Sequence, residues 1–175
     1  VTGSQHLYGE KPLAIVKEQT EKIIDGLNKT GTFPFQIKFK GVLTTSAQIS
    51  NFFNEANSAE DCIGVIGWMH TFSPAKMWVN GLTQFNKPLL HLHTQFDEEI
   101  PWHSINMDYM NLNQSAHGDR EFGFINTRLN ITRKVVTGHW QEDHVKHKIN
   151  VWMRAAAAWQ DARGAKIARI GDNMR

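Results

Sequence analysis

The segment from Asn111 to Phe124 is rich in amide side chains and carries a histidine and an acidic-basic-acidic run, which is too polar for an ordinary core segment. Gln114 and His117 are its strongest candidates for ligand contacts. Gln114 lies near the expected end of one helix, and His117-Gly118 is expected to interrupt the helical pattern before Asp119 starts the next helix. Both side chains would then project from one exposed corner, although the same residues could also serve as caps of the two helices.

Polar and aromatic residues also lie at four expected strand ends, at the edge of the sheet where open α/β proteins bind their ligands. Amide and imidazole groups pair with sugar hydroxyls, and aromatic rings stack on the carbon face of a sugar. This composition permits a sugar site without requiring one, because loops at strand ends are polar in any soluble α/β protein. The segments are Gly3 to Gly9, Trp68 to Ser73, His93 to Gln95 and Gly138 to Gln141.

Nine histidines raise the question of a metal site, and two pairs have suggestive spacing. His91 and His93 would project from one face of a strand, and His144 and His147 would share one face of a helix. Neither pair has a carboxylate placed to complete a recognised ligand pattern, and no His-Glu-x-x-His motif occurs. The sequence therefore favours structural or solvated histidines and predicts no metal-ligating residue in this chain.

Nucleotide and thiol chemistry are not indicated. The sequence lacks both the Gly-x-Gly-x-x-Gly turn that lets a backbone approach a pyrophosphate and the Gly-x-x-x-x-Gly-Lys-Ser/Thr phosphate loop. The single cysteine, Cys62, lies in an apolar run and is expected to be an inert side chain rather than a nucleophile. One cysteine cannot form an internal disulfide, which favours a reducing, cytoplasmic environment.

The composition is that of an ordinary globular domain, with 41% hydrophobic and 21% charged residues. The formal net charge is +2 and the nineteen basic residues are scattered, so no electrostatic footprint for nucleic acid or an anionic membrane is present. No apolar stretch approaches the roughly 18 residues of a membrane span, and no basic-then-apolar leader opens the sequence. We expect neither nucleic acid nor a membrane as a partner.

Strand and helix patterns alternate along the chain. Apolar runs indicate strands covered on both faces, and apolar residues spaced by threes and fours indicate the helices that cover them. Because right-handed crossovers place such helices on both sides of a sheet, we predict an α/β, doubly wound, mostly parallel sheet of the Rossmann-like or flavodoxin-like kind. The expected strands are 35–40, 62–68, 87–93, 134–137 and 166–170. The expected helices are 12–27, a helix that begins at 44–46, and the helices 73–85, 104–113, 120–129 and 143–163. Ser73 and Ser104 are the expected caps of the helices 73–85 and 104–113.

The boundaries of the domain are less clearly marked. Val1-Thr2-Gly3 reads like the end of a further strand that runs into a loop. Gly164 is the expected stop of the long last helix. We therefore predict one N-terminal α/β domain over residues 1–164, with residues 165–175 supplying the first strand and loop of a following domain.

Five motifs, in order along the chain, carry a resemblance to a known family. They are Gly3-Ser-Gln-His-Leu-Tyr-Gly9, His70-Thr-Phe-Ser-Pro-Ala-Lys-Met-Trp78, His93-Thr-Gln-Phe96, Met110-Asn-Leu-Asn-Gln-Ser-Ala-His-Gly-Asp-Arg-Glu-Phe-Gly123 and Val136-Thr-Gly-His-Trp140. Together they resemble the corresponding motifs of the L-arabinose isomerases over essentially the whole chain. The family's polypeptide is much longer, so the resemblance is to its N-terminal portion and implies a sheet truncated at both ends.

The resemblance implies an enzyme that interconverts L-arabinose and L-ribulose, often with slow conversion of D-galactose to D-tagatose. The family uses a divalent ion, usually Mn²⁺, held by two glutamates and two histidines further along its chain, and it assembles as trimers that pair into hexamers. None of those four ligands has a counterpart here. No catalytic residue is therefore expected in this chain, and the 175 residues alone are expected to be inactive.

The same resemblance assigns five substrate-contacting residues. Gln5, Leu7 and Tyr8 match the motif that lines the sugar pocket, and Gln114 and His117 match the pair that reaches the sugar hydroxyls across a subunit boundary. Their implied role is to orient and enclose the sugar. Two alternatives stay open, namely a non-catalytic sugar-binding or interaction module and an isomerase of another sugar such as L-fucose.

Overall fold

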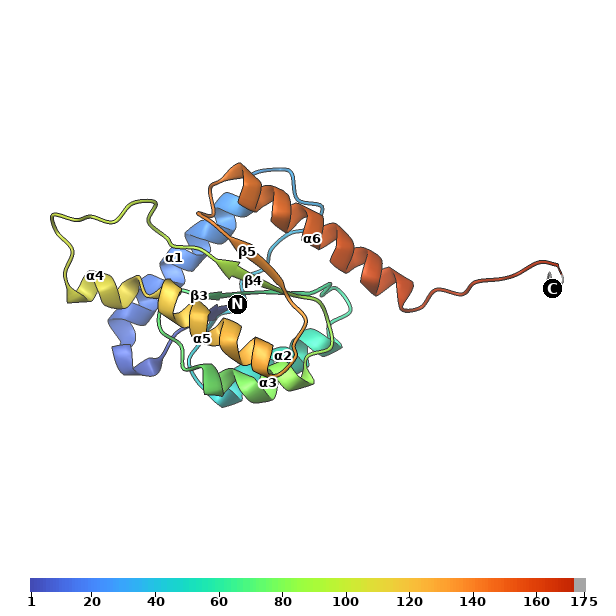
Figure 1. Ribbon diagram of the computed structural model, residues 1–175, viewed down its shortest axis with the longest axis horizontal. Helices are drawn as coiled ribbons and strands as arrows, with labels where there is room; N and C mark the ends of the chain where they lie inside the picture. Colours follow the sequence, from blue (N-terminus) through green and yellow to red (C-terminus); the bar gives the residue numbers. More distant parts are fainter. Residues whose placement is uncertain (172–175) are drawn as a thin grey trace.

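Five parallel strands form one sheet in the computed structural model, which describes residues 1–171 (Figure 1). The strands are β1 (Thr2–Gly3), β2 (Val42–Leu43), β3 (Val65–Met69), β4 (Leu89–His93) and β5 (Lys134–Thr137). Their spatial order is β2-β1-β3-β4-β5, which places β1 between β2 and β3. This is the strand order of the flavodoxin-like doubly wound fold, and it confirms the predicted fold class.

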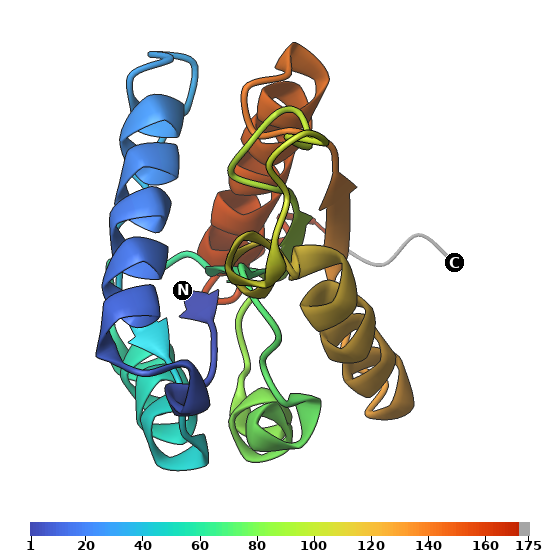
Figure 2. The same ribbon diagram turned by 90° about the vertical axis from the view of Figure 1, so that its left-hand side faces the viewer.

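Helices cover both faces of the sheet, as right-handed crossovers require. In the described residues they are η1 (His6–Tyr8), α1 (Glu10–Asn28), α2 (Ser46–Ser58), η2 (Ala75–Trp78), α3 (Val79–Gln84), α4 (Met107–Leu112), α5 (Ser115–Arg128) and α6 (Asp143–Ala162). Figures 1 and 2 show α1 and α6 on one face and α2, α3 and α5 on the other. None of the helices in this part of the chain has both the length and the apolar character needed to cross a bilayer.

Two hydrophobic cores fill the layers between the sheet and its helices. Neighbouring strand residues alternate between them, so that Trp68 packs with α1 and α6 while Met69 packs with α2, α3 and α5. In the second core, the Trp78 ring meets the edges of Phe53 and Phe122 at centroid distances of 6.3 and 5.0 Å. Burial on both faces explains why β3 and β4 read as continuous apolar runs in the sequence.

The predicted strand at residues 35–40 is wrong. These residues belong to no strand, and β2 pairs with β1 through Val42 and Leu43 instead. The reason lies in α1, where the Asn28 side chain binds both backbone groups of Ile37: its Nδ2 donates to the Ile37 carbonyl and its Oδ1 accepts from the Ile37 N–H, each at 2.9 Å. A side chain therefore takes the hydrogen bonds that a neighbouring strand would make.

The predicted strand at residues 166–170 is also wrong for the structure described here. This segment is not part of the sheet, and Ile167 and Ile170 are 95% and 99% exposed. Its alternating apolar residues indicate a strand only where a surface covers one of its faces. Residues 172–175, part of the expected loop of a following domain, lie outside the described residues, so that domain assignment stays a prediction.

Two predicted helix caps are replaced by nearby residues. Ser73 does not cap its helix, because its hydroxyl accepts a hydrogen bond from Trp78 Nε1 at 3.0 Å and η2 begins after Pro74. Ser104 is displaced by Asn106, whose side chain accepts from the Tyr109 N–H at 2.8 Å at the start of α4. In both places a competing hydrogen bond or a stronger capping amide decides the start of the helix.

Candidate functional site

The end of β1 leads directly into the first candidate segment. Ser4 follows the strand and is buried, and its hydroxyl pairs with the Thr71 hydroxyl at 2.8 Å, just beyond β3. Gln5 then precedes the single turn η1, with its backbone extended and its side chain half-buried. Within η1, Leu7 is 79% exposed and Tyr8 is half-buried. The strand thus delivers these side chains to the carboxyl edge of the sheet.

The second candidate segment is the first turn of α5. Gln114 is the residue before the helix, and its carbonyl accepts hydrogen bonds from the N–H groups of His117 and Gly118 at 3.1 and 2.9 Å. His117 therefore lies inside α5, and the predicted break at His117-Gly118 is wrong. The glycine is needed for close packing, because a Cβ at Gly118 would overlap the carbonyl oxygen of Thr71.

The loop after β3 brings the two segments to the same edge. Thr71 contacts Ser4 on one side and lies under Gly118 on the other, while the Phe72 ring lies 5.0 Å from the ring of His117. In Figure 1 this edge is at the left, where α4 and the long loop before it extend beyond the sheet. The structure therefore places all five predicted residues around one edge, from two segments that are far apart in the sequence.

The polar side chains at this edge have few competing partners. Gln114 Nε2 donates to Asn111 Oδ1 at 3.3 Å, and the half-exposed His117 ring lies 3.4 Å from Glu121 Oε1. These contacts are long and lie at the surface, so a ligand hydroxyl can replace them at low cost. An amide and an imidazole held in this way can orient a polyhydroxylated ligand, whereas Leu7 offers it only apolar contact.

One residue important for this geometry was assigned incorrectly from the sequence. Asp119 does not balance a helix dipole at an exposed N-terminus but is buried within α5, where it accepts hydrogen bonds from Met69 N and from His91 Nε2. A signal for this existed, because Ser115, Asp119, Phe122 and Asn126 recur at helical spacing and are all buried. An acid on such a face requires a buried partner.

Comparison with known proteins now identifies the family. A profile described as the L-arabinose isomerase N-terminal domain matches residues 1–164. The chain belongs to this family. It is 57% identical over its full length to the L-arabinose isomerase of Geobacillus thermodenitrificans (strain NG80-2), 58% identical to that of Geobacillus stearothermophilus and 57% identical to that of Thermotoga petrophila.

Each of these matches covers all 175 residues of the chain but 35% of the relative. The chain thus spans about a third of the length of the L-arabinose isomerases it matches. The resemblance found in the motifs is confirmed at the level of the family. The chemistry of the whole enzyme remains a matter for proposal, because most of the relatives' length has no counterpart here.

One cluster of side chains in this L-arabinose isomerase domain has the residue types of a metal site. Among the described residues, His91, His93 and Asp119 have potential ligand atoms within 4.8 Å of one another. Both nitrogens of His91 are engaged, however: Nε2 lies 2.8 Å from Asp119 and Nδ1 lies 3.2 Å from His93 Nε2. A metal ion at this cluster would therefore have to displace hydrogen bonds that already hold its members together.

Burial explains the charge state of this cluster. It lowers the pKa of His91 to about 2 and raises that of Asp119 well above its usual range, so both groups favour their neutral forms. A neutral His91 donates from Nε2 to Asp119 and accepts at Nδ1 from His93, which fixes the tautomers of both rings. The cluster therefore works as a buried hydrogen-bond chain that joins β4 to α5.

The second histidine pair of the sequence analysis does not form a site either. His144 Nδ1 pairs with Glu142 at 2.8 Å and its Nε2 lies 3.2 Å from the Thr137 carbonyl oxygen, while His147 is exposed. Both residues lie in the first turns of α6, and His144 packs over Gly138 at the end of β5. This pair serves the connection between β5 and α6.

Proposed function

We propose that this chain forms one wall of the sugar pocket in an L-arabinose isomerase that interconverts L-arabinose and L-ribulose, with D-galactose to D-tagatose as a side activity. The proposal is supported by the family membership and by one observation in particular. The segment carrying Gln5, Leu7 and Tyr8 and the segment carrying Gln114 and His117 both adjoin the loop after β3. They therefore act as one surface at the carboxyl edge of the sheet, where α/β folds bind ligands.

Each residue has a defined task in this proposal. The Gln5 and Gln114 amides and the His117 imidazole exchange hydrogen bonds with sugar hydroxyls and hold the open chain in one orientation. Leu7 and Tyr8 cover the carbon face and exclude water. None of these groups is placed to move a proton between sugar carbons, so their contribution is orientation and enclosure.

The metal ion belongs, in this proposal, to the part of the enzyme beyond these residues. Mn²⁺ would supply polarisation of the sugar oxygens there. Its ligands lie outside this chain, in keeping with the His91 cluster, whose donors are already engaged with one another. The chain alone accordingly binds no catalytic metal and has no isomerase activity.

A second subunit completes the pocket. Leu7, Trp102 and Met107 are 79%, 74% and 65% exposed, and all three lie in η1, α4 or the loop before α4. Large apolar side chains gathered at one edge are typical of a surface covered in an assembly. We therefore propose that this edge faces a neighbouring subunit in a homo-oligomer, a trimer or a hexamer, located in the cytoplasm.

The test uses the complete isomerase that contains this domain. We expect His117→Ala and Gln114→Ala each to raise KM for L-arabinose about five- to tenfold, which corresponds to the loss of one hydrogen bond of about 1 kcal/mol. The matched controls are His147→Ala and Gln84→Ala, which remove the same groups from exposed positions on α6 and α3. Equal KM values for the site variants and the controls would refute the proposed wall.

A second experiment separates this function from that of a self-contained sugar-binding module. The 175-residue chain is titrated calorimetrically with L-arabinose and with ribitol. Half a pocket buries too little of the ligand for measurable affinity, so we expect no binding heat up to millimolar sugar. Saturable binding that His117→Ala abolishes would favour the module and count against a shared pocket.

A further inference from the structure

Two buried hydroxyl groups join the loops that carry the two halves of the pocket wall proposed above. Ser4 follows β1 and Thr71 follows β3, and both side chains are withdrawn from water, at 0% and 1% exposure. The Ser4 Oγ and Thr71 Oγ1 atoms lie 2.8 Å apart. Ser4 directly precedes Gln5, and Thr71 directly precedes Phe72, whose ring lies 5.0 Å from that of His117. The contact therefore lies between the two groups of residues that are proposed to meet the sugar.

The protons of this pair have a defined order. Thr71 Oγ1 also donates to the carbonyl oxygen of Phe72, at 3.3 Å. A hydroxyl group has one proton to donate and two lone pairs that accept. Since Thr71 uses its proton for the Phe72 carbonyl, Ser4 is the donor to Thr71. Valine in place of Thr71 would leave the Ser4 hydroxyl without an acceptor in a dry site, whereas alanine in place of Ser4 leaves Thr71 its carbonyl acceptor.

Both members of the pair are also held through their backbones. On the side of β1, the Ser4 N–H donates to the Leu43 carbonyl at 3.1 Å, and the backbone of Gln5 continues in an extended conformation. On the side of α5, the Thr71 carbonyl oxygen lies so close to Gly118 that a Cβ there would overlap it. Thr71 thus meets the loop after β1 through its hydroxyl and the first turn of α5 through its carbonyl. A shift of this one residue would change the distance between the two.

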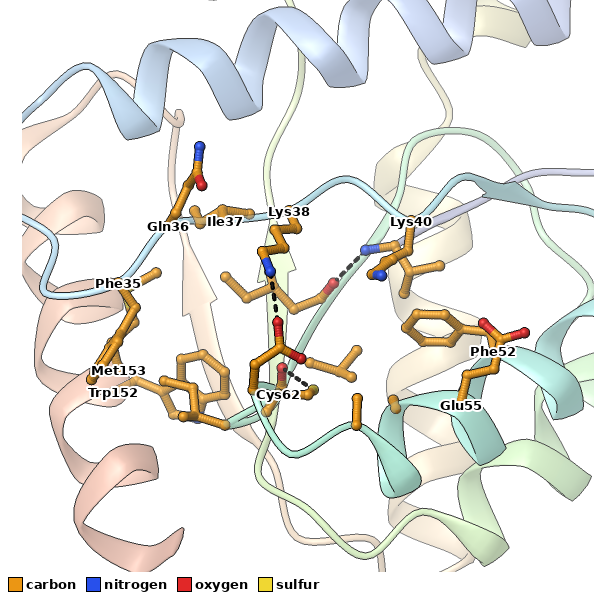
Figure 3. A pocket seen from close by; sticks show the side chains of 18 residues that line it. Phe35, Gln36, Ile37, Lys38, Lys40, Phe52, Glu55, Cys62, Trp152 and Met153 are labelled. Carbon is orange, nitrogen blue, oxygen red and sulfur yellow. Dashed lines mark hydrogen bonds and ion pairs between the residues drawn. The ribbon is translucent and has the colours of Figure 1, made fainter. Parts of the chain in front are cut away.

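The hydroxyl pair lies apart from the pocket drawn in Figure 3. Cys62, Trp152 and the first residues of β3 line that pocket, whereas Thr71 follows the other end of β3. Neither Ser4 nor Thr71 is among the described residues that line it. The buried hydrogen bond between them therefore belongs to the carboxyl edge of the sheet, where the pocket wall is proposed to lie.

We propose that Ser4 and Thr71 are positioning residues of the pocket wall. Their hydrogen bond sets the spacing between its two halves, one carrying Gln5 and the other carrying Gln114 and His117. This inference rests on the sugar-binding function proposed above. A buried hydroxyl pair adds little net stability, but it fixes the distance and the direction between the two segments that it joins. Side chains that orient a substrate must be held to within about 0.5 Å, and the pair supplies that precision without touching the sugar.

A second hydroxyl pair in the same domain provides a matched control. Thr2 Oγ1 donates to Thr20 Oγ1 at 3.2 Å, and Thr20 Oγ1 donates to the Val16 carbonyl at 2.7 Å. Both threonines are buried, at 1% and 3% exposure. The order of hydroxyl, threonine hydroxyl and backbone carbonyl is the same as in the first pair. This second pair, however, joins β1 to the middle of α1 instead of the two loops at the carboxyl edge.

The experiment measures KM and kcat for L-arabinose in the complete isomerase, together with the urea midpoint of each variant. We expect Thr71→Val to raise KM about fivefold and Ser4→Ala to raise it about two- to threefold. Thr71→Ser keeps the hydroxyl and should retain a KM within about twofold of the parent value. Thr20→Val should lower the urea midpoint about as much as Thr71→Val but leave KM unchanged, because a loss of folded enzyme lowers the measured kcat alone.

A double-mutant cycle with His117→Ala tests whether Thr71 acts through the pocket wall. In the His117→Ala background we expect Thr71→Val to raise KM by less than about twofold. Equal increases of KM in the two backgrounds, or equal increases for Thr71→Val and Thr20→Val, would overturn the positioning role. If Thr71→Val does not fold, Ser4→Ala carries the test, and a parental KM for Ser4→Ala would overturn the proposal.

The variants of the wall itself separate this inference from the function on which it rests. Parental KM values for both Gln5→Ala and His117→Ala would refute the sugar wall, and the positioning role with it. Raised KM values for these two variants, together with a parental KM for Thr71→Val, would refute the positioning role alone.

Discussion

Asp119 in α5 and Met69 at the end of β3 are joined by a buried hydrogen bond, in which the Met69 N–H donates to the Asp119 carboxyl group at 3.2 Å. His91 Nε2 reaches the same oxygen at 2.8 Å. One side chain therefore fixes α5 to two neighbouring strands at once. Since Gln114 and His117 lie at the start of this helix, their position depends on a contact in the interior of the domain.

Replacing Asp119 should be costly. Asp119→Ala leaves the Met69 N–H and the His91 ring without their acceptor in a dry environment, and we expect a loss of about 2–4 kcal/mol in the free energy of unfolding. Asp119→Asn keeps an acceptor oxygen and should lose less. Urea denaturation of the three proteins at neutral pH measures the difference, and an alanine variant within about 0.5 kcal/mol of the parent would contradict this role.

Adding a methyl group at Gly118 should disturb the packing of α5 on β3. A Cβ there would overlap the Thr71 carbonyl and crowd Met69, so we expect Gly118→Ala to cost about 1–3 kcal/mol and to raise KM for L-arabinose in the complete isomerase. Gly164→Ala is the matched control, because a Cβ at Gly164 meets no atom within 4 Å. If the two alanine variants have the same stability, α5 does not pack on β3 as described.

His70 should make the stability of the domain sensitive to acid. Its buried ring pairs with Gln19 through Nε2 at 2.5 Å, and burial lowers the pKa of His70 from 6.5 to about 4. Between these two pH values the unfolded chain binds a proton that the folded chain does not. Stability therefore falls as the pH drops from 6.5 towards 4, by up to about 3 kcal/mol for this residue.

The measurement compares the parent chain with His70→Gln, which has no titrating ring. Unfolding free energies are determined by urea denaturation at several pH values between 4 and 7, and the two curves are subtracted so that other titrating groups cancel. We expect the parent to lose more stability on acidification than the variant. Parallel curves would show that His70 is not responsible.

Manganese should leave the isolated chain unchanged. Binding at His91, His93 and Asp119 would have to break the hydrogen bonds that join them, so we expect ~1 mM Mn²⁺ or a chelator to shift the melting temperature by less than about 1 °C. Differential scanning calorimetry measures the shift. A rise that grows with the Mn²⁺ concentration and disappears in His93→Ala would place a metal site in this domain.

The sequence predicted the architecture well wherever the residues that decide a pattern all lie within one helix or strand. Lys134–Thr137 was predicted to the residue, and α6 to within one residue at its end, because strand and helix periodicities there agree with the burial of the folded chain. The prediction of a strand at residues 35–40 failed because the Asn28 side chain forms hydrogen bonds with both backbone groups of Ile37. Asn28 lies seven residues before the segment begins. No local pattern reports such a contact.

The candidate site shows a different limit. Gln114 and His117 remain predictions, and one local argument for them was wrong, since Gly118 was interpreted as a helix stop and in fact allows α5 to approach Thr71. Asp119 was missed because its partners, Met69 and His91, are 50 and 28 residues away. Spacing within a segment indicates candidate side chains for a site, whereas the contacts that hold them in place come from the tertiary fold.

Helix α5 both packs in the core and carries residues of the proposed pocket wall. This has a practical consequence for altering the sugar preference of an L-arabinose isomerase. Phe122 contacts the rings of Trp78 and His91 in the core and lies little more than one helical turn from His117. A change of volume at Phe122 or Trp78 is expected to tilt α5 and to move the proposed pocket wall with it. Libraries aimed at new substrates should therefore include these buried positions, which differ from the side chains that are proposed to meet the sugar.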